Sequence, residues 1–236
     1  MEVGSFRAVP QFLADGACAA ETLAVPGSYA WSKDLDQTYG SAADGDEVGS
    51  VADVMDPANF RLEKGPAGAD IAHKVVFSYI YDLPFGPGKH FASSLPGPVT
   101  RFIEGWSFSG ITTFESGSPI TIRIDDDPAN TGAEYARPDL VGNPGVVPGS
   151  RRVLEWFNTG AFRDPVAPPY RYGTAGRGLV NAPGINNWDL ALLKDTAIHE
   201  RLKLQFRTEF FNAFNYLQWG NPDIDMSGLE LRRNLE

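Results

Sequence analysis

Residues 201–210 alternate between polar and apolar side chains without interruption, and this period of two constrains the fold more than any other feature of the chain. Such alternation predicts a β-strand with one hydrated face and one apolar face. In a soluble sheet the apolar face would cover a protein core. In a membrane β-barrel it would contact lipid, while the polar face would line a water-filled lumen. The remaining sequence has to distinguish these two arrangements.

The rest of the chain predicts further strands of the same kind. The 236 residues include 25 glycines and 18 prolines, which favours many strands joined by turns and loops over long helices. Period-two segments occur at residues 74–83, 106–115, 120–125 and 187–192, and a weaker one at 23–31 is interrupted by Pro26 and Gly27. We therefore expect an all-β protein of about six antiparallel strands.

Two kinds of connection join these segments. Residues 115–119 and 195–200 are short and predict hairpin loops, the first with Gly117 available for a positive φ. Residues 33–72 and 125–185 predict two long loops rich in Gly, Pro, Asn and Asp, with one or two helical turns at residues 151–157. Because three predicted strands separate the two long loops, simple counting places them at opposite ends of the sheet, although both have the character of external loops. We therefore expect that one strand is missed, as around residues 170–172, or wrongly added.

Composition excludes several classes of protein. The net charge of −10 argues against a nucleic-acid partner, because binding to phosphates depends on clustered Lys and Arg. The single cysteine, Cys18, excludes an intrachain disulfide. No apolar run reaches the roughly 18 residues that a membrane-spanning helix needs. The first thirty residues do not fit a signal peptide, since Glu2 and Asp15 interrupt its charge and apolar pattern, which suggests a fragment of an exported protein.

No motif predicts catalysis or a cofactor. The glycine-rich residues 173–178 are not followed by a helix pattern, as a phosphate-binding loop would be. The three histidines, His73, His90 and His199, lack metal-ligand spacing. The acidic residues 125–127 and 44–47 could supply oxygen ligands to calcium or a carboxylate pair for glycoside hydrolysis, but neither group completes a known signature. We expect a protein that is not an enzyme and has no cofactor.

Aromatic and charged side chains segregate between the two faces of the predicted strands. Aromatic rings with polar tips are favoured at a lipid–water boundary, whereas Lys or Arg near the middle of a lipid-facing surface costs about 2–4 kcal/mol. The candidates for the lipid-facing aromatic band are Phe77, Tyr79, Tyr81, Trp106, Phe108, Trp188, Leu204, Phe206 and Phe210. The candidates for the lumen-facing side are Lys74, Asp82, Arg201, Lys203, Gln205, Arg207 and Glu209.

Several spaced segments carry a resemblance to a known family. They are residues 28–33 (SYAWSK), 73–86 ending in DLPFG, 105–110 (GWSFSG), 115–119 (ESGSP), 156–162 (WFNTGAF), 187–190 (NWDL) and 204–215 (LQFRTEFFNAFN). In this order they resemble the C-terminal barrel portion of TonB-dependent outer-membrane receptors of the Oar-like group, whose members carry a carboxypeptidase-regulatory-like domain. The resemblance covers about residues 28–221.

The resemblance implies a transmembrane β-barrel of about 22 strands, plugged by an N-terminal domain, that imports a bulky ligand with energy from TonB. Its implied partners are outer-membrane lipid, the plug domain, TonB and the ligand, and its implied location is the outer membrane. This chain lacks a plug segment and has too few strands to close such a barrel. We therefore expect an incomplete barrel at residues 23–221, which does not function alone, with residues 1–22 and 222–236 unassigned.

One alternative remains open at this point. An aromatic-rich β-sandwich that binds carbohydrate in solution would show the same alternation, because its core would also be aromatic. The ligand, the strand orientation and calcium binding by the acidic loops are not readable from the sequence.

Overall fold

The computed structural model describes most of the chain. The described residues are 4–8, 23–37, 54–56, 58–94, 96–132, 136–145, 155–166, 168–199 and 202–226, with residues 4–8 and 199 described by their backbone alone.

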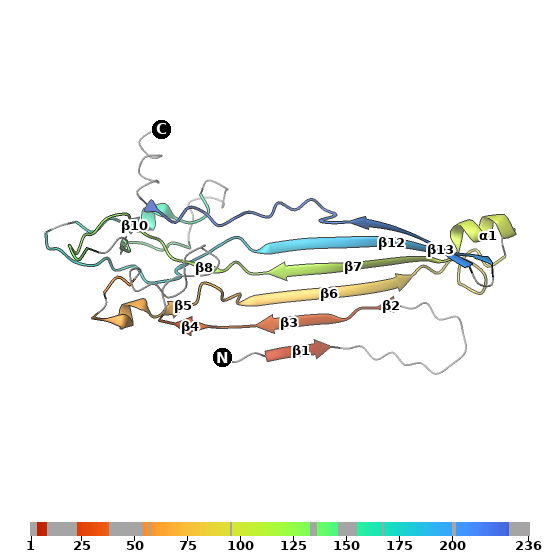
Figure 1. Ribbon diagram of the computed structural model, residues 1–236, viewed down its shortest axis with the longest axis horizontal. Coiled ribbons are helices and arrows are strands. Elements are labelled where there is room, and N and C mark those ends of the chain that lie inside the picture. Colours follow the sequence, from red (N-terminus) through yellow and green to blue (C-terminus); the bar gives the residue numbers. More distant parts are fainter. Residues whose placement is uncertain are drawn as a thin grey trace, which may run out of the picture.

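A single open antiparallel sheet forms the body of the protein, with strand order β1-β3-β6-β7-β12-β13 and β2 also paired to β6 (Figure 1). Its strands are β1 (Gly4–Ala8), β2 (Leu23–Ala24), β3 (Gly27–Trp31), β6 (His73–Asp82), β7 (Trp106–Glu115), β12 (Ile185–His199) and β13 (Leu202–Phe210). The two edges, β1 and β13, are not paired with each other among the described residues. The predicted all-β, antiparallel and incomplete barrel is confirmed.

Several strands begin or end at other residues than the sequence predicted. The weak strand at 23–31 is present but divided into β2 and β3 by Val25 and Pro26. The strand predicted at 187–192 extends over residues 185–199, so Asp195 lies within β12 and not in a hairpin loop. Residues 4–8, which fitted no pattern, form edge strand β1 against β3. Their assignment depends on pairing that a local pattern does not reveal.

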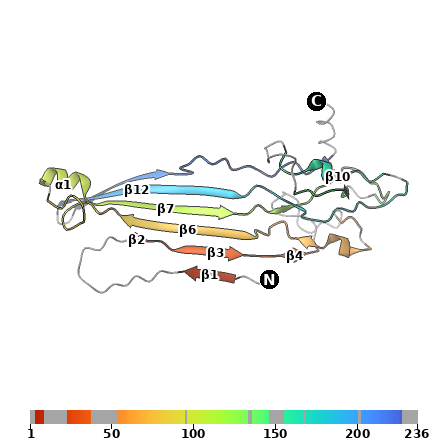
Figure 2. The same ribbon diagram turned by 180° about the vertical axis from the view of Figure 1, so that it is seen from behind.

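Short elements gather at the two ends of the sheet (Figures 1 and 2). One end carries the helix α1 (Gly97–Ile103). The other carries the 3₁₀ turns η2 (Phe60–Glu63) and η3 (Thr159–Ala161) and three two-stranded sheets. These sheets pair β4 (Leu35–Asp36) with β5 (Gly65–Pro66), β8 (Pro119–Ile120) with β11 (Val180–Asn181), and β9 (Asp139–Leu140) with β10 (Phe162–Arg163). We call the described parts of residues 32–72, 116–184 and 221–226 the loop cap.

The strand predicted at residues 120–125 and the hairpin predicted before it are wrong. Only residues 119–120 are in a strand, and β7 pairs with β6 and β12 instead. The alternating Ile120, Ile122 and Ile124 point into the core of the loop cap, where each is at most 3% exposed. An alternating pattern shows that one side of a segment is buried, but not what covers it. The pattern alone therefore did not distinguish a strand of the sheet from a segment buried in the cap.

Removing that strand places both long loops at the same end of the sheet. Only β6 and β7 lie between them, so the chain leaves the loop cap along β6 and returns along β7. At the other end are the connection that contains α1, residues 83–105, and the link between β12 and β13. The count that placed the loops at opposite ends is therefore wrong, and the expectation that one strand was wrongly added is confirmed at residues 120–125 and not at 170–172.

The loop cap contains the hydrophobic core of the described structure. Phe157 and Phe162 pack edge to face at its centre, with ring centroids 6.0 Å apart, and Trp156 packs against the same cluster. The further buried members are Ile120, Ile122, Ile124, Ala136, Ala161, Ala175, Val180, Ala182 and Met226. Residues 151–154 of the predicted helical turn lie outside the described residues, and residues 155–157 are not helical. The cap is thus a folded unit and not an irregular loop.

A buried ion pair ties the two long loops of the cap together. Arg137 donates to both carboxylate oxygens of Glu63, at 3.1 and 3.3 Å, and also to the carbonyl of Leu62 at 2.8 Å. The side chains are 2% and 0% exposed. Arg177 adds a second link, because it donates to the carbonyl of Glu63 at 2.6 Å and to Asp36 at 2.9 Å. Charges this deeply buried must be paired, so the ion pair fixes how the loops meet.

Two glycines of the cap are required by close approach of backbone. A Cβ atom on Gly173 would lie 1.8 Å from the Arg137 carbonyl oxygen, and one on Gly117 would lie 1.7 Å from that of Ala182. Gly117 does not have the positive φ expected of a hairpin glycine. In the cap, the glycine-rich residues 173–178 therefore pass close against the backbone at Arg137, and Arg177 within them donates to the carbonyl of Glu63.

Glu63→Gln tests the buried pair. The substitution leaves Arg137 buried without its counter-charge, so we expect the cap to lose about 3–5 kcal/mol of stability. Hydrogen exchange of cap amides, measured in detergent micelles, should show faster opening at residues 54–72 and 136–145. Glu209→Gln, which changes an exposed ion pair on the sheet, should leave these rates nearly unchanged. Equal effects of the two variants would contradict this role of the pair.

Candidate functional site

Strand register places the predicted aromatic residues on one face of the sheet. Directly paired residues of neighbouring strands project to the same side. Tyr79 pairs with Gly110, which pairs with Leu190, which pairs with Phe210. The same counting brings all nine predicted members of the band together, namely Phe77, Tyr79, Tyr81, Trp106, Phe108, Trp188, Leu204, Phe206 and Phe210. We call this side the aromatic face.

Two aromatic rings on this face lie across glycines of the adjacent strand. A Cβ atom on Gly110 would be 2.6 Å from the Tyr79 hydroxyl oxygen, and one on Gly27 would be 3.0 Å from the Phe77 ring. Tyr79 also stacks on Phe108, with ring centroids 5.8 Å apart. The glycines thus let the rings lie flat along the sheet, which joins β3, β6 and β7 by side-chain packing as well as by hydrogen bonds.

The lysine and histidine side chains of the aromatic face lie at its two ends. Lys194 lies at the end near α1, with its ammonium 5.2 Å from the centroid of the Trp106 ring. It donates to the carbonyls of Arg101 at 3.0 Å and Glu104 at 2.6 Å. At the cap end, Tyr29 and His73 share a 2.8 Å hydrogen bond. Between these positions, the described strand residues of this face carry no charge. Sequence reasoning missed Lys194 because the pattern was followed only to residue 192.

The opposite face, here called the polar face, carries the predicted lumen residues. Register places Lys74, Asp82, Lys203, Gln205, Arg207 and Glu209 on it, whereas Arg201 lies outside the described residues. Lys74 and Glu115 form an ion pair across β6 and β7 at 2.5 Å. Gln205 donates to Asp195 across β12 and β13 at 2.9 Å, and Arg207 pairs with Glu209 along β13. Polar side chains on this face therefore pair with one another, both across neighbouring strands and along β13.

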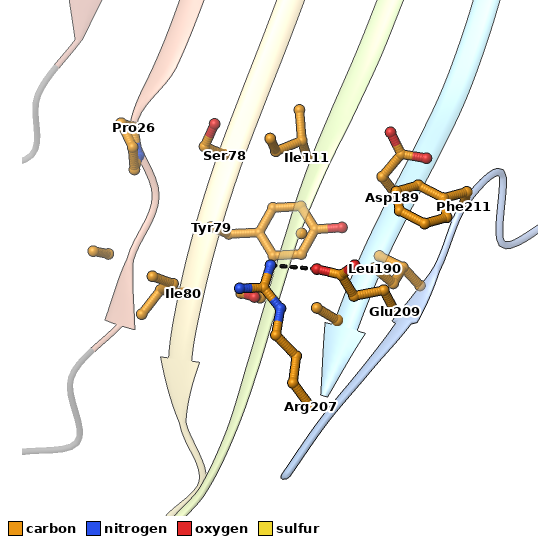
Figure 3. Close-up of a pocket in the computed structure, with 14 residues that line it drawn as sticks. Pro26, Ser78, Tyr79, Ile80, Ile111, Asp189, Leu190, Arg207, Glu209 and Phe211 are labelled. Atoms are coloured by element: carbon orange, nitrogen blue, oxygen red, sulfur yellow. Dashed lines mark ion pairs between the residues drawn. The ribbon is translucent and has the colours of Figure 1, made fainter. Parts of the chain in front are cut away.

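A shallow pocket of about 450 Å³ lies on the sheet beside Arg207 and Glu209 (Figure 3). Ile80 and Ile111 give it an apolar part, and the Arg207–Glu209 pair and Asp189 give it a charged rim. The Asp189 carboxylate accepts from the Asn187 amide and the Asn212 backbone, both at 2.9 Å. Sequence reasoning missed these isoleucines and Asp189, which only the register of three strands brings to one place. Such a surface can contact a ligand that has both apolar and polar parts.

The aromatic face is not covered by a second layer of the described protein. Leu204 and Phe206 remain 58% and 57% exposed. A soluble β-sandwich requires a second sheet over this side, and none of the described strands outside the cap provides one. The sandwich alternative therefore lacks the layer on which it depends.

The strands have the length that a bilayer requires. The ten residues of β6 or of β7 extend about 33 Å at about 3.3 Å per residue. At a tilt of about 40° they would span about 25 Å, the height of the apolar band on membrane barrels. This height separates His73 and Lys194, at the two ends of the uncharged part of the face.

The acidic residues of the loop cap do not assemble a metal site within the described part of the chain. A hydrogen bond with Asp225, followed by desolvation, raises the pKa of Asp125. The Arg171 guanidinium, which donates to both oxygens of Asp139, lowers the pKa of that carboxyl. Residues 44–47, the other acidic group, lie outside the described residues. The cap carboxylates described here serve pairing within the cap.

No helix among the described residues has the length and apolar character needed to cross a membrane.

Comparison with protein families gives a match over nearly the whole chain. Residues 18–229 match the model described as an outer membrane beta barrel domain. The chain belongs to this family. The protein is accordingly an outer-membrane protein that associates with membrane lipid, and its open sheet is part of a β-barrel. Comparisons with curated proteins and with solved structures found no match.

Lysine substitutions at neighbouring positions test which face meets lipid. Phe77 and Ser78 lie side by side in β6 and project to the aromatic and polar faces. Phe77→Lys should destabilise the protein in lipid vesicles by about 2–4 kcal/mol, whereas Ser78→Lys should cost at most about 1 kcal/mol. Urea unfolding in vesicles measures both, and Phe77→Leu controls for loss of the ring. A larger loss for Ser78→Lys would reverse the assignment of the two faces.

Proposed function

We propose that this protein is part of a TonB-dependent, Oar-like outer-membrane receptor that takes up a bulky ligand. The observation that supports the proposal best is a sheet of membrane-spanning length that ends in a large folded cap. One face of this sheet is uncharged between its two ends, and the other is polar. Its family membership supports the outer-membrane barrel, and the spaced segments of its sequence support the receptor group. In this proposal, the plug domain and TonB are partners of the complete receptor.

The proposal assigns ligand contact to the polar face and the loop cap, and it assigns no catalytic residue and no cofactor. Outer-membrane barrels have short periplasmic turns and longer extracellular loops. By that rule the loop cap faces outward and α1 faces the periplasm. A ligand would then meet the cap first and the pocket beside Arg207 and Asp189 further along the same sheet.

The open edges imply that these residues alone do not form a transporter. An unpaired backbone group in hydrocarbon costs several kcal/mol, and both β1 and β13 have one edge without a partner among the described strands. Detergent-solubilised protein of this sequence should therefore run at the same position on a gel with and without boiling. A compact monomer whose migration changes on heating would show a closed barrel and contradict the fragment proposal.

Uptake is tested in cells that carry the complete receptor. Cells that lack it and cells that lack TonB should lose accumulation of the same compound from a labelled panel of ferric siderophores, maltodextrins and oligopeptides. Complementation with receptor carrying Arg207→Glu should reduce accumulation while leaving receptor abundance unchanged. Uptake that depends on the receptor but not on TonB would overturn the assignment to this receptor group.

A further inference from the structure

The connection between β6 and β7 carries apolar side chains that no other part of the described protein covers. Within it, Phe102 of α1 is 72% exposed, and Val99 and Phe91 are about half exposed. Burying one such side chain contributes roughly 1.5–3 kcal/mol, so exposure of several together is costly in water. An exposed apolar cluster of this kind marks a site of interaction.

Of these side chains, Phe102 borders an apolar pocket of about 490 Å³. Phe102 and Ile103 line it from α1, Ala92 from the preceding loop, and Trp106 and Leu192 from the sheet. The volume is within the range of small-molecule sites, roughly 300–1,000 Å³. Because Trp106 and Leu192 also belong to the aromatic face, the pocket is continuous with the surface that we assign to lipid.

Specific hydrogen bonds hold α1 above this pocket. The Trp106 ring nitrogen donates to the carbonyl of Phe102 at 3.0 Å. Lys194 donates to the carbonyls of Arg101, in the last turn of the helix, and Glu104, the residue that follows its end. Polar atoms of the sheet thus satisfy carbonyls at the helix end, while Phe102 stays largely exposed at the pocket. These hydrogen bonds therefore fix the position of α1, and with it the shape of the pocket.

The charge of this end suits the headgroup of a phospholipid. Residues 83–105 contain the cations Lys89 and Arg101 against one carboxylate, Glu104, in a protein whose net charge is −10. Arg101 is exposed on the same short helix as Phe102. A cation beside exposed rings is the arrangement by which protein segments lie at a membrane surface, with the cation near lipid phosphate.

We propose that α1 and the pocket beneath it bind one acyl chain of a membrane phospholipid, with Arg101 beside the phosphate. This inference rests on the proposed contact of the aromatic face with lipid. It adds a defined lipid site at the end of the barrel opposite the loop cap. The chain occupies the space lined by Ala92, Phe102 and Leu192, and it covers apolar surface that the protein itself leaves open.

Native mass spectrometry of the full chain in detergent, with dioleoylphosphatidylglycerol as the probe, tests the site. The wild-type protein should retain one lipid. Ala92→Leu fills the pocket and should lower the retained fraction about tenfold, since each methylene of the lipid displaced from it reduces binding roughly fourfold. Arg101→Gln should lower it roughly fivefold. Val166→Leu, an exposed apolar change in the cap, is the matched control and should have no effect.

Two results would overturn the lipid site. One is retention that is the same in Ala92→Leu and in the control. The other is competition by soluble glycerol phosphate, which has the headgroup without an acyl chain, that is as strong as competition by the phospholipid itself. Partition of the wild-type chain between vesicles and buffer separates this failure from failure of lipid contact by the aromatic face. Protein that enters vesicles without a specific lipid refutes only the site, whereas protein that stays in buffer also refutes lipid contact by this chain. The receptor proposal itself is decided by the uptake test in cells.

Discussion

The in-register pairing of β6, β7, β12 and β13 is the constraint on which the rest of the structure depends. Each pairing fixes which side chains share a face, and a shift of one strand by one residue would send all aromatic rings of that strand to the polar side. The Tyr79 ring over Gly110 and the Lys74–Glu115 pair fit this register on opposite faces. Separation of charge from aromatic surface is therefore a property of the whole sheet and not of any one strand.

The two ends of the sheet are stabilised in different ways. The loop cap has its own apolar core and a buried Glu63–Arg137 pair, so it resembles a small soluble domain. The sheet between the ends has no core on either side within the described residues, and its apolar surface needs lipid. At the other end, Lys194 and Trp106 hold α1 through its backbone carbonyls. The protein thus combines water-adapted and lipid-adapted packing in one chain.

Much of the sheet was predictable because period-two alternation is a local signal. The pattern located β6, β7 and β13 closely, and it assigned the aromatic residues to one side of each strand. It failed at residues 120–125, where the same alternation serves burial in the cap. It also missed β1 and α1, since residues 4–8 gain their strand only from β3, and residues 97–103 form too short a helix to show a period.

The sequence by itself determined that the chain is all-β, that its strands have one apolar and one polar side, and that it resembles outer-membrane receptors. These properties follow from the order of side chains along each segment. The tertiary structure decided that both long loops meet in one cap, that Ile80, Ile111 and Asp189 share a pocket, and that Lys194 lies beneath α1. Such features join residues far apart in the chain, and their proximity depends on strand order and register, which no local pattern encodes.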